Sequence, residues 1–296
     1  MSDLHTYHGI QEKLTHPNKV PLSEFIDHFD LFANRSFPSH WHHELEIQLI
    51  IRGSALYSVN GSSYTVEEGS AIYIAPEAVH TMHSLEPDTV GYDIVLLPQF
   101  LVELIHNLNC DSCTRHLTSK QPSSFLITPD RKECHSILDT LRKMYYAESS
   151  QAAYDLFLLE SILCIWRNLF PLFPKQEVKT EDEGLLLREI RMKAMLSYIW
   201  EHYTMPITIE DLANSANISK SECFRCFSEL SKTTPMEYIN QFRLLQAAQL
   251  LSSSGKSISD ICYMTGFNNT SYFSKKFKEQ YDMTPRAYRV QNRIQR

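Results

Sequence analysis

Residues 40–46 have the sequence HWHHELE, which places three histidines and two glutamates within seven positions. Imidazole and carboxylate groups are the side chains that ligate divalent metal ions and that transfer protons. They also form hydrogen bonds with the hydroxyl groups of small organic molecules. The segment therefore indicates either a metal centre that does chemistry or a pocket that recognises a ligand.

An extended strand would gather the polar residues of this segment on one face, because side chains two residues apart in a strand point to the same side. That face would carry His40, His42, Glu44, Glu46 and Gln48. The opposite face would carry Leu45, Ile47 and Leu49. A further histidine, His80, lies on another expected strand and would complete a cluster of three imidazoles and a carboxylate.

The surrounding sequence predicts a β-rich half followed by helices. From about residue 25 to 98, apolar and polar residues alternate and turn signals are frequent. In YSVNGSSYTV, Asn60 and Gly61 separate two alternating runs, which is typical of a tight β-hairpin. From about residue 99 to 170 the apolar period becomes helical. A proline-containing, charged segment at 171–184 then indicates a linker, and the rest of the chain is helical.

The two halves of the chain also differ in charge. The net charge of the 296 residues is −7, but residues 188–296 carry 15 Lys and Arg against 10 Asp and Glu, a net charge of +5. Residues 1–187 carry 13 against 25, a net charge of −12. A basic half joined to an acidic half points to a nucleic-acid partner for the basic half.

Signals of secretion and membrane insertion are missing from the sequence. The start, MSDLHTYHGIQEKL, has neither the basic nor the apolar region of a signal peptide. The most apolar stretch, residues 156–173, is interrupted by Glu160 and Arg167. Seven cysteines favour reduced thiols, and the C-x-x-C pairs at Cys110 and Cys223 are too far apart in the chain to predict a shared zinc site. We therefore expect a cytoplasmic protein without a membrane partner.

The C-terminal region contains an internal repeat. The segment 207–239 recurs at 256–289, with matching positions 49 or 50 residues apart. Each copy predicts a short helix, a turn and a second helix that begins after a capping residue, Ser219 in the first copy and Asn269 in the second. This is the pattern of a helix-turn-helix, and two such units suit two successive major grooves, which recur about every 34–36 Å along a duplex.

Helical spacing predicts which face of each second helix meets DNA. Cys223, Cys226 and Phe227 share the core face of the first, and Phe273 and Phe277 share that of the second. The outer faces carry Lys220, Ser221, Phe224, Arg225 and Ser228 in the first helix and Thr270, Ser271, Lys275 and Lys278 in the second. These outer faces are the candidate DNA-binding surface.

Three of these residues have side chains suited to particular contacts. Arg225 is able to pair bidentately with guanine, and Phe224 is able to pack on a thymine methyl group. Lys275 is able to reach a base or a phosphate. The alternative for each polar residue is an ordinary solvated helix face, and the repeated architecture favours DNA.

The segment GFNNTSYFSKKFKEQYDMTPRAYR, residues 266–289, closely resembles the C-terminal signature of AraC-type transcriptional regulators. Residues from about 188 to 290 resemble the two-unit helix-turn-helix domain of that family, which implies sequence-specific binding to double-stranded DNA. By position, the resemblance places DNA contacts at Ser221, Phe224 and Arg225 and at Thr270, Ser271, Tyr272 and Lys275. Phe224 departs from the polar residues often found at its position, which favours an apolar contact there.

The N-terminal half resembles the sensor domain that many of these regulators carry, a small cupin-type β-barrel followed by helices. The spacing of the first cupin motif is matched by His40, His42, Glu46 and Gly53, and that of the second by Gly69 and His80. The first motif lacks its leading glycine, and Glu77 stands where glycine is usual. The resemblance implies that this barrel binds a small-molecule effector.

We therefore expect an effector site at His40, His42, Glu46 and His80. Carbohydrate is the leading class of effector, because imidazole and carboxylate groups hydrogen-bond sugar hydroxyls and because the family often senses sugars. The same four residues would also suit zinc, iron, manganese or nickel. Since regulator cupins often keep such histidines without metal, a metal is the minority hypothesis, and we expect neither metal nor other cofactor.

The complete prediction is an α+β protein that regulates transcription and is not an enzyme. It has a cupin-like β-barrel with trailing helices at 1–170, a linker at 171–184 and an all-helical domain of two helix-turn-helix units at 185–296. We expect an effector-responsive activator of a catabolic operon, with double-stranded DNA, a small molecule, RNA polymerase and a second copy of the chain as partners. The alternatives are a cupin metalloenzyme with a DNA-binding tail and a regulator controlled by a protein partner.

Overall fold

The computed structural model describes residues 22–107, 122–150, 152–173 and 183–292. These residues form two compact units, one rich in β-strands and one mainly helical that also includes residues 30–40 and 81–83, and each is described by itself. The fold is α+β, which confirms the predicted class. Among the described residues no helix combines the length and the apolar character needed to cross a membrane. The C-x-x-C pair that begins at Cys110 lies outside the described residues, as does most of the expected linker.

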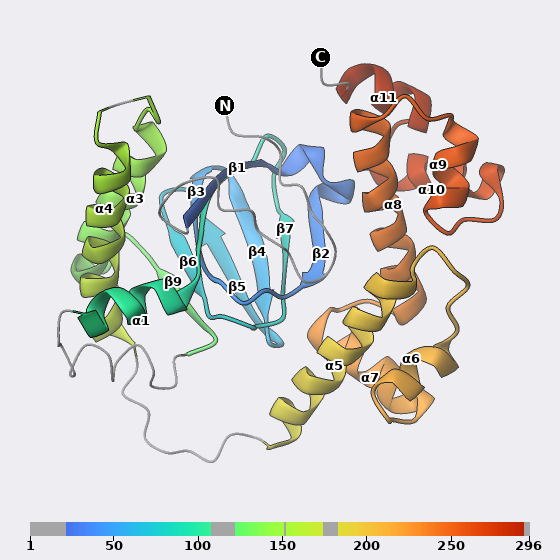
Figure 1. Ribbon diagram of the computed structural model, residues 1–296, viewed down its shortest axis with the longest axis horizontal. Helices are drawn as coiled ribbons and strands as arrows, with labels where there is room; N and C mark the ends of the chain where they lie inside the picture. The colour runs from blue at the N-terminus through green and yellow to red at the C-terminus, as the bar shows by residue number, and fades with distance from the viewer. Residues whose placement is uncertain (1–21, 108–121, 151, 174–182, 293–296) are drawn as a thin grey trace. The chain divides into compact units, whose positions relative to one another are not determined.

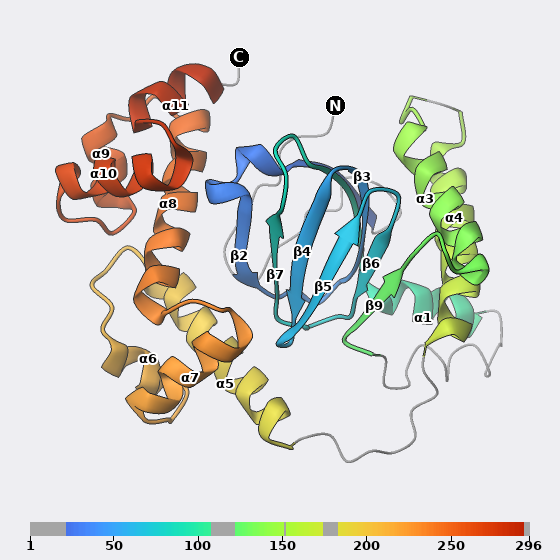
Figure 2. The same ribbon diagram turned by 180° about the vertical axis from the view of Figure 1, so that it is seen from behind.

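The strands of the described residues form two sheets (Figures 1 and 2). They are β1 (Leu22–His28), β2 (Ser36–His40), β3 (Leu45–Arg52), β4 (Ser54–Val59), β5 (Ser62–Glu67), β6 (Ala71–Ile74), β7 (His80–Ser84), β8 (Val90–Leu96) and β9 (Ser124–Ile127). One sheet has the order β1-β8-β3-β6-β9, and its neighbouring strands run antiparallel. The other has the order β2-β7-β4-β5, which Figure 2 shows facing the viewer.

Helices cover the outer face of the five-stranded sheet. They are α1 (Pro98–Asn107), α3 (His135–Tyr146) and α4 (Tyr154–Leu169). Short 3-10 turns are η1 (Phe29–Leu31), η2 (Ala33–Arg35), η3 (Lys132–Cys134) and η4 (Phe170–Leu172). Leu45, Ile47 and Leu49 of β3 are buried in one cluster with apolar residues of these helices. The predicted apolar face of this strand is therefore the face that meets the helices.

The opposite face of β3 points toward the four-stranded sheet. Tyr57 of β4 donates a hydrogen bond to the side chain of Gln48, and His80 of β7 lies against Glu46. Alternation along a strand explains this division, because Glu46 and Gln48 are two residues apart. Polar side chains consequently line the interior between the two sheets around Glu46 and Gln48.

Two local features show how closely the sequence predicted the strands. The expected hairpin is present between β4 and β5, and both Asn60 and Gly61 have positive φ, as the favoured two-residue turn requires. In contrast, β9 lies in the region that the periodicity assigned to helices, so that prediction was wrong for these four residues. A strand of four residues is too short to show a period, and its partner β6 is about 50 residues away in the sequence.

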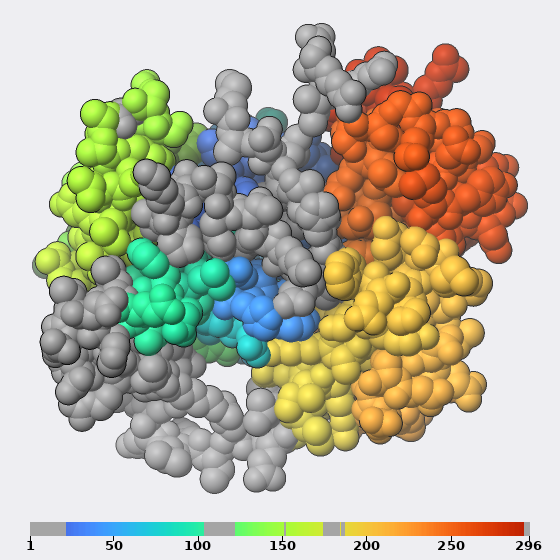
Figure 3. Space-filling view, in the orientation of Figure 1, coloured from blue at the N-terminus to red at the C-terminus, as the bar shows by residue number. Residues whose placement is uncertain are grey.

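The helical unit contains the two predicted helix-turn-helix copies. Its helices are α5 (Glu183–His202), α6 (Ile209–Ser215), α7 (Lys220–Leu230), α8 (Pro235–Ser253), α9 (Ile258–Met264), α10 (Thr270–Tyr281) and α11 (Pro285–Asn292). The first copy is α6 and α7, the second is α9 and α10, and α8 connects them. Figure 3 shows the helices of this unit as one continuous yellow-to-red surface.

Matching caps fix where the helices of the two copies begin. Thr208 and Ser257, at an offset of 49 residues, form capping boxes at α6 and α9 with the aspartate three residues further on. The side chains of Ser219 and Asn269 accept hydrogen bonds at the starts of α7 and α10, which confirms both predicted capping residues. Thr234 forms a third capping box at α8.

The turn of each copy uses a residue with left-handed backbone. Asn217 has a φ of 52° and Gly266 a φ of 81°, and they too are 49 residues apart. The turn at Gly266 is the more crowded, because a Cβ built there would lie 2.1 Å from the carbonyl oxygen of Tyr203 and 2.8 Å from Nε of Arg243. Arg243 occupies this space because its Nε donates to that same carbonyl at 2.8 Å.

We predict that Gly266→Ala lowers the free energy of unfolding of the helical unit by about 2–4 kcal/mol, because strained backbone and steric overlap both oppose the added methyl group. Urea denaturation followed by circular dichroism measures the change. Gly255→Ala is the matched control, since a Cβ there meets nothing within 4 Å. We expect it to change stability by less than about 0.5 kcal/mol, and equal effects of the two substitutions would contradict the account.

Candidate DNA-binding surface and ligand site

Helices α7 and α10 each bury one face and expose the other. Cys223, Cys226 and Phe227 of α7 and Phe273 and Phe277 of α10 have no exposed surface, which confirms the predicted core faces. The exposed residues of α7 include Lys220, Ser221, Phe224, Arg225 and Ser228. Those of α10 include Ser271, Tyr272, Lys275 and Lys278, and Thr270 is half-buried at the start of the helix. The structure therefore places the predicted residues on two equivalent outer faces.

A pair of arginines meets one carboxylate beside the first of these faces. Glu222 accepts from Arg225 of its own helix at 2.6 Å and from Arg191 of α5 at 2.8 Å. The hydrogen bond from Arg225, together with the charges of the arginines, holds the pKa of Glu222 below its usual value despite partial burial. Glu222 thus restrains the guanidinium of Arg225 at the surface. Sequence analysis missed this carboxylate, although its position three residues before Arg225 on a helix was a usable signal.

The corresponding face of α10 carries more positive charge. Lys276 forms an ion pair with Glu279 at 2.8 Å, and Lys275 lies 3.8 Å from the same carboxylate. The Lys276 ammonium also lies 6.0 Å from the ring centre of Tyr272. Tyr272 is 44% exposed, so this face combines cationic groups with an accessible aromatic ring. Such a combination suits both phosphate and base contacts.

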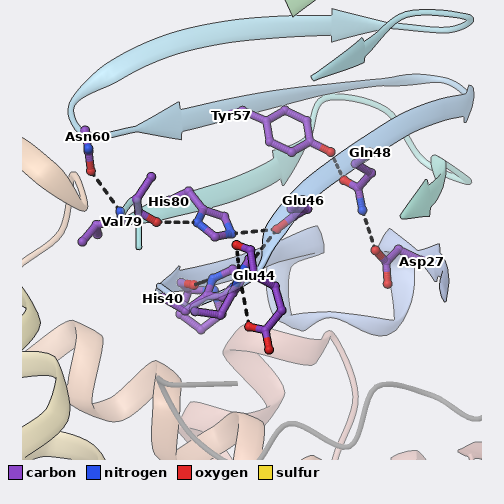
Figure 4. Close-up of polar contacts among 12 residues, drawn as sticks. Asp27, His40, Glu44, Glu46, Gln48, Tyr57, Asn60, Val79 and His80 are labelled. Carbon is purple, nitrogen blue, oxygen red and sulfur yellow. Dashed lines mark hydrogen bonds and ion pairs between the residues drawn. The ribbon is translucent and has the colours of Figure 1, made fainter. Parts of the chain in front are cut away.

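The second predicted site is a buried polar cluster between the sheets (Figure 4). One oxygen of the Glu46 carboxylate, Oε2, lies 3.0 Å from Nε2 of His42 and 3.1 Å from Nε2 of His80. His40 joins them, and the four potential ligand atoms of the cluster all lie within 4.8 Å of one another. Each of the four residues is buried, with at most 6% of its surface exposed. The structure therefore brings together every residue that the sequence assigned to this site.

The residues of this cluster do not lie on the single strand that the alternation of side chains predicted. β2 ends at His40 and β3 begins at Leu45, so residues 41–44 form a connection and not a strand. His42 enters the cluster from this connection, whose backbone is held where the amide of Glu77 donates to the carbonyl of His42 at 2.7 Å. The parity argument was correct for β3 and wrong for the residues before it, since a connection has no fixed period.

Backbone carbonyls orient the three imidazole rings. Nδ1 of His40 lies 3.1 Å from the carbonyl oxygen of Pro38, and Nδ1 of His80 lies 2.8 Å from that of Ala78. Nδ1 of His42 lies 3.0 Å from the carbonyl oxygen of Glu44. The rings of His42 and His80 are nearly perpendicular, at 83°, and their Nε2 atoms converge on Glu46. Each of the three rings thus uses its Nδ1 atom for a hydrogen bond with a backbone carbonyl.

The electrostatics of the cluster centre on Glu46. Complete burial by itself raises the pKa of this carboxyl, but the charge of His80 and the hydrogen bonds from His42 and His80 outweigh burial. The net effect is a pKa well below the usual value of a glutamate. Glu46 is therefore present as a carboxylate whose negative charge must be balanced by cationic groups around it.

A second polar group lies deeper in the same interior. Gln48 donates to Asp27 of β1 at 2.5 Å and accepts from the hydroxyl of Tyr57. All three side chains are buried. Sequence analysis placed Gln48 on this face but missed Asp27 and Tyr57, because a lone aspartate in LSEFIDH and an isolated tyrosine carry no spacing that separates them from ordinary strand residues.

Comparison with known proteins connects both sites to one family. The AraC-like ligand binding domain matches residues 28–163, and a Helix-turn-helix domain matches residues 212–291. YdeC of Bacillus subtilis, an uncharacterized HTH-type transcriptional regulator, is 28% identical over 276 residues, 93% of each chain. The HTH-type transcriptional activator RhaS of Escherichia coli is 24% identical over 257 residues, 86% of this chain and 87% of its own. Among solved structures, ToxT from Vibrio cholerae is 14% identical with a TM-score of 0.44, covering 92% of this chain and 98% of that chain.

The two matched domains account for the two sites in their order along the chain. The ligand-binding domain contains the buried histidine cluster, and the helix-turn-helix domain contains α7 and α10. The relatives that match along most of their length are transcriptional regulators and not enzymes. The chain belongs to the AraC-type family of transcriptional regulators, with an N-terminal ligand-binding domain and a C-terminal helix-turn-helix domain that binds DNA.

Proposed function

We propose that this regulator is an effector-responsive activator, in which α7 and α10 read two neighbouring DNA segments and the barrel binds the effector. The observation that carries the DNA part is the repetition of geometry: α7 and α10 each follow a left-handed turn and a side-chain cap, and each exposes polar and aromatic residues. The relative RhaS is named as an activator, which supports the same sign of regulation here. RNA polymerase is then the expected partner of the DNA-bound protein.

The proposed contacts to DNA are Lys220, Ser221, Phe224, Arg225, Thr270, Ser271, Tyr272, Lys275 and Lys278. Arg225 is assigned to a base, because Glu222 restrains its guanidinium and a restrained fork loses less entropy on pairing with guanine. Phe224 is 45% exposed on the same face, which supports an apolar contact with a thymine methyl group. Lys278 is assigned to a phosphate.

The proposed effector site is the cluster of His40, His42, Glu46 and His80, because it gathers buried imidazole and carboxylate groups within the matched ligand-binding domain. The operon that such an activator serves would be catabolic, with carbohydrate as the organic effector expected from the sequence. Effector binding changes DNA affinity only if it distinguishes two states of the protein, and a coupling of about 1–3 kcal/mol is typical.

A homodimer is supported by an apolar face on α4. Leu156 and Leu163 are 66% and 37% exposed, and they are two turns apart on one side of the helix. Glu160 and Arg167 lie on the same side by helical spacing, so opposite charges lie one turn to either side of Leu163. Two copies of this face pair antiparallel with each glutamate near the other copy's arginine, which is the self-complementarity that two-fold symmetry requires.

The base assignment predicts different consequences for two basic residues of the surface. Arg225→Ala should weaken binding to the preferred DNA site by about 1–3 kcal/mol and relax the preference at one base pair. Lys278→Ala should weaken binding to all sequences alike and reduce its salt dependence. Fluorescence anisotropy with a panel of single-substituted duplexes distinguishes the two patterns. The docking of both helices is wrong if neither substitution alters binding.

The dimer assignment predicts that Leu163→Glu converts the protein to a monomer, because it buries a charge without a partner in the contact between copies. Sedimentation velocity measures the change. Leu187→Glu is the matched control, since Leu187 is 45% exposed on α5 and lies outside the proposed contact. A wild-type protein that sediments as a monomer at micromolar concentration would exclude this interface.

A further inference from the structure

We infer that Arg191 and Glu222 are positioning residues for DNA reading, which orient Arg225 toward a guanine base and oppose its pairing with phosphates. Arg191 lies on α5, outside both helix-turn-helix copies. Neither Arg191 nor Glu222 is among the proposed DNA contacts. Their role rests on the proposed function, because it acts through the base contact of Arg225.

One carboxylate joins the two guanidinium groups. Nη2 of Arg225 lies 2.6 Å from Oε2 of Glu222 and 2.8 Å from its Oε1. Nη1 of Arg191 donates to the same Oε1 at 2.8 Å. A guanidinium carries five N–H donors in a fixed planar fork, and the contacts with Glu222 use those of Nη2. Donors on Nη1 and Nε of Arg225 are thus left for an acceptor on DNA.

Burial divides this network into an anchored part and an accessible part. The side chains of Glu222 and Arg191 are 17% and 26% exposed, whereas that of Arg225 is 53% exposed. An exposed ion pair restrains its members weakly, because both side chains lose entropy when they pair. Here Arg191 already fixes the carboxylate, so that Arg225 alone loses freedom when the second pair forms. Arg225 therefore meets DNA already oriented.

The charge of Glu222 acts on the choice between bases and phosphates. A phosphate attracts any cation, and such contacts raise the affinity for every DNA sequence. The carboxylate beside Arg225 lowers that attraction, because it brings a negative charge toward the DNA backbone. A guanine edge is uncharged and offers two acceptors that an arginine fork matches. Glu222 therefore favours the base over the phosphate as the partner of Arg225.

The second copy shows that a helix-turn-helix folds without this network. Tyr272 and Lys275 of α10 stand at the positions that correspond to Glu222 and Arg225, 50 residues further along the chain. Lys275 is 74% exposed and lies 3.8 Å from Glu279. The carboxylate at position 222 is therefore an addition to the first copy that the fold itself does not require.

A second ion pair joins the same two helices and provides a matched control. Nη1 of Arg188, one turn before Arg191 on α5, lies 3.2 Å from Oε2 of Glu229 on α7. If these pairs served only to pack α5 on α7, both would behave alike. Arg188→Met and Arg191→Met each remove one arginine of α5 and keep a long, unbranched apolar side chain.

The test measures base preference and overall affinity separately, by fluorescence anisotropy with the full-length protein. The probes are a duplex that the wild type selects from a random pool, its variants at the base pair that Arg225→Ala relaxes, and a duplex of unrelated sequence. Glu222→Gln should lower the preference at that base pair by about five- to tenfold, part of the roughly 5–150-fold that one arginine–guanine pair supplies. It should also strengthen binding to the unrelated duplex by about two- to fivefold at low salt, because a negative charge near the phosphates is removed.

The arginine variants separate reading from packing. Arg191→Met should lower the same base preference without strengthening binding to the unrelated duplex, because the carboxylate remains. Arg188→Met should leave the preference unchanged. When Arg225→Ala is already present, neither Glu222→Gln nor Arg191→Met should change the preference further, since both act through Arg225. Glu222→Gln keeps the shape of the side chain, so it decides the matter even if Arg191→Met does not fold.

The inference is overturned if Glu222→Gln keeps the wild-type base preference, or if Arg188→Met and Arg191→Met have equal effects. It is also overturned if Arg191→Met weakens binding to every duplex to the same extent, which would make Arg191 a phosphate contact. Failure of the proposed function gives a different result, in which Arg225→Ala leaves the preference unchanged at every base pair. That result would remove the base contact itself, and with it the role of Glu222.

Discussion

The buried guanidinium of Arg243 is the interaction on which the DNA-binding unit depends. It extends from α8, donates to the carbonyl oxygens of Tyr203 and Met205 at 2.8 and 2.7 Å, and lies 6.0 Å from the ring centre of Phe267. The two carbonyls follow α5, which packs on the first helix-turn-helix, and Phe267 belongs to the turn of the second. One side chain thus ties α8 to both copies. Burial lowers the pKa of Arg243, but an arginine stays charged at any physiological pH. Its hydrogen bonds to the two carbonyls are therefore kept throughout that range.

The ligand-binding unit buries several ionisable side chains away from water. Its outer sheet face is apolar and covered by helices, while Glu46, Gln48 and Asp27 lie in the interior with the imidazoles. Side chains that serve only to stabilise such an interior would be better replaced by apolar ones, because buried polar groups rarely repay their desolvation. Their presence in a domain that matches a ligand-binding family supports the proposed effector site.

Sequence reasoning predicted most of the helical unit and the members of the buried cluster, and the physical reason differs between the two. Capping residues such as Ser219 and Asn269 hydrogen-bond within the first turn of their own helix, so a local sequence pattern is enough to predict them. The internal repeat shows that pattern twice. The cluster was predicted from motif spacing, although His42 reaches it from a connection that no period describes. β9 and the partnership of Glu222 with Arg191 depend on residues distant in the chain, so local patterns did not reveal them.

If two rigidly connected helices read DNA together, the spacing of the two DNA elements they recognise is fixed, and selection of binding sites from random duplexes measures that spacing. Because α7 and α10 are held by one connecting helix, we expect selected sites with two preferred elements whose centres are about 10–10.5 base pairs apart, one helical turn. Substitutions in α7 should relax one element and substitutions in α10 the other. A single preferred element, or two elements whose spacing varies freely, would show that α7 and α10 do not read DNA as one rigid pair.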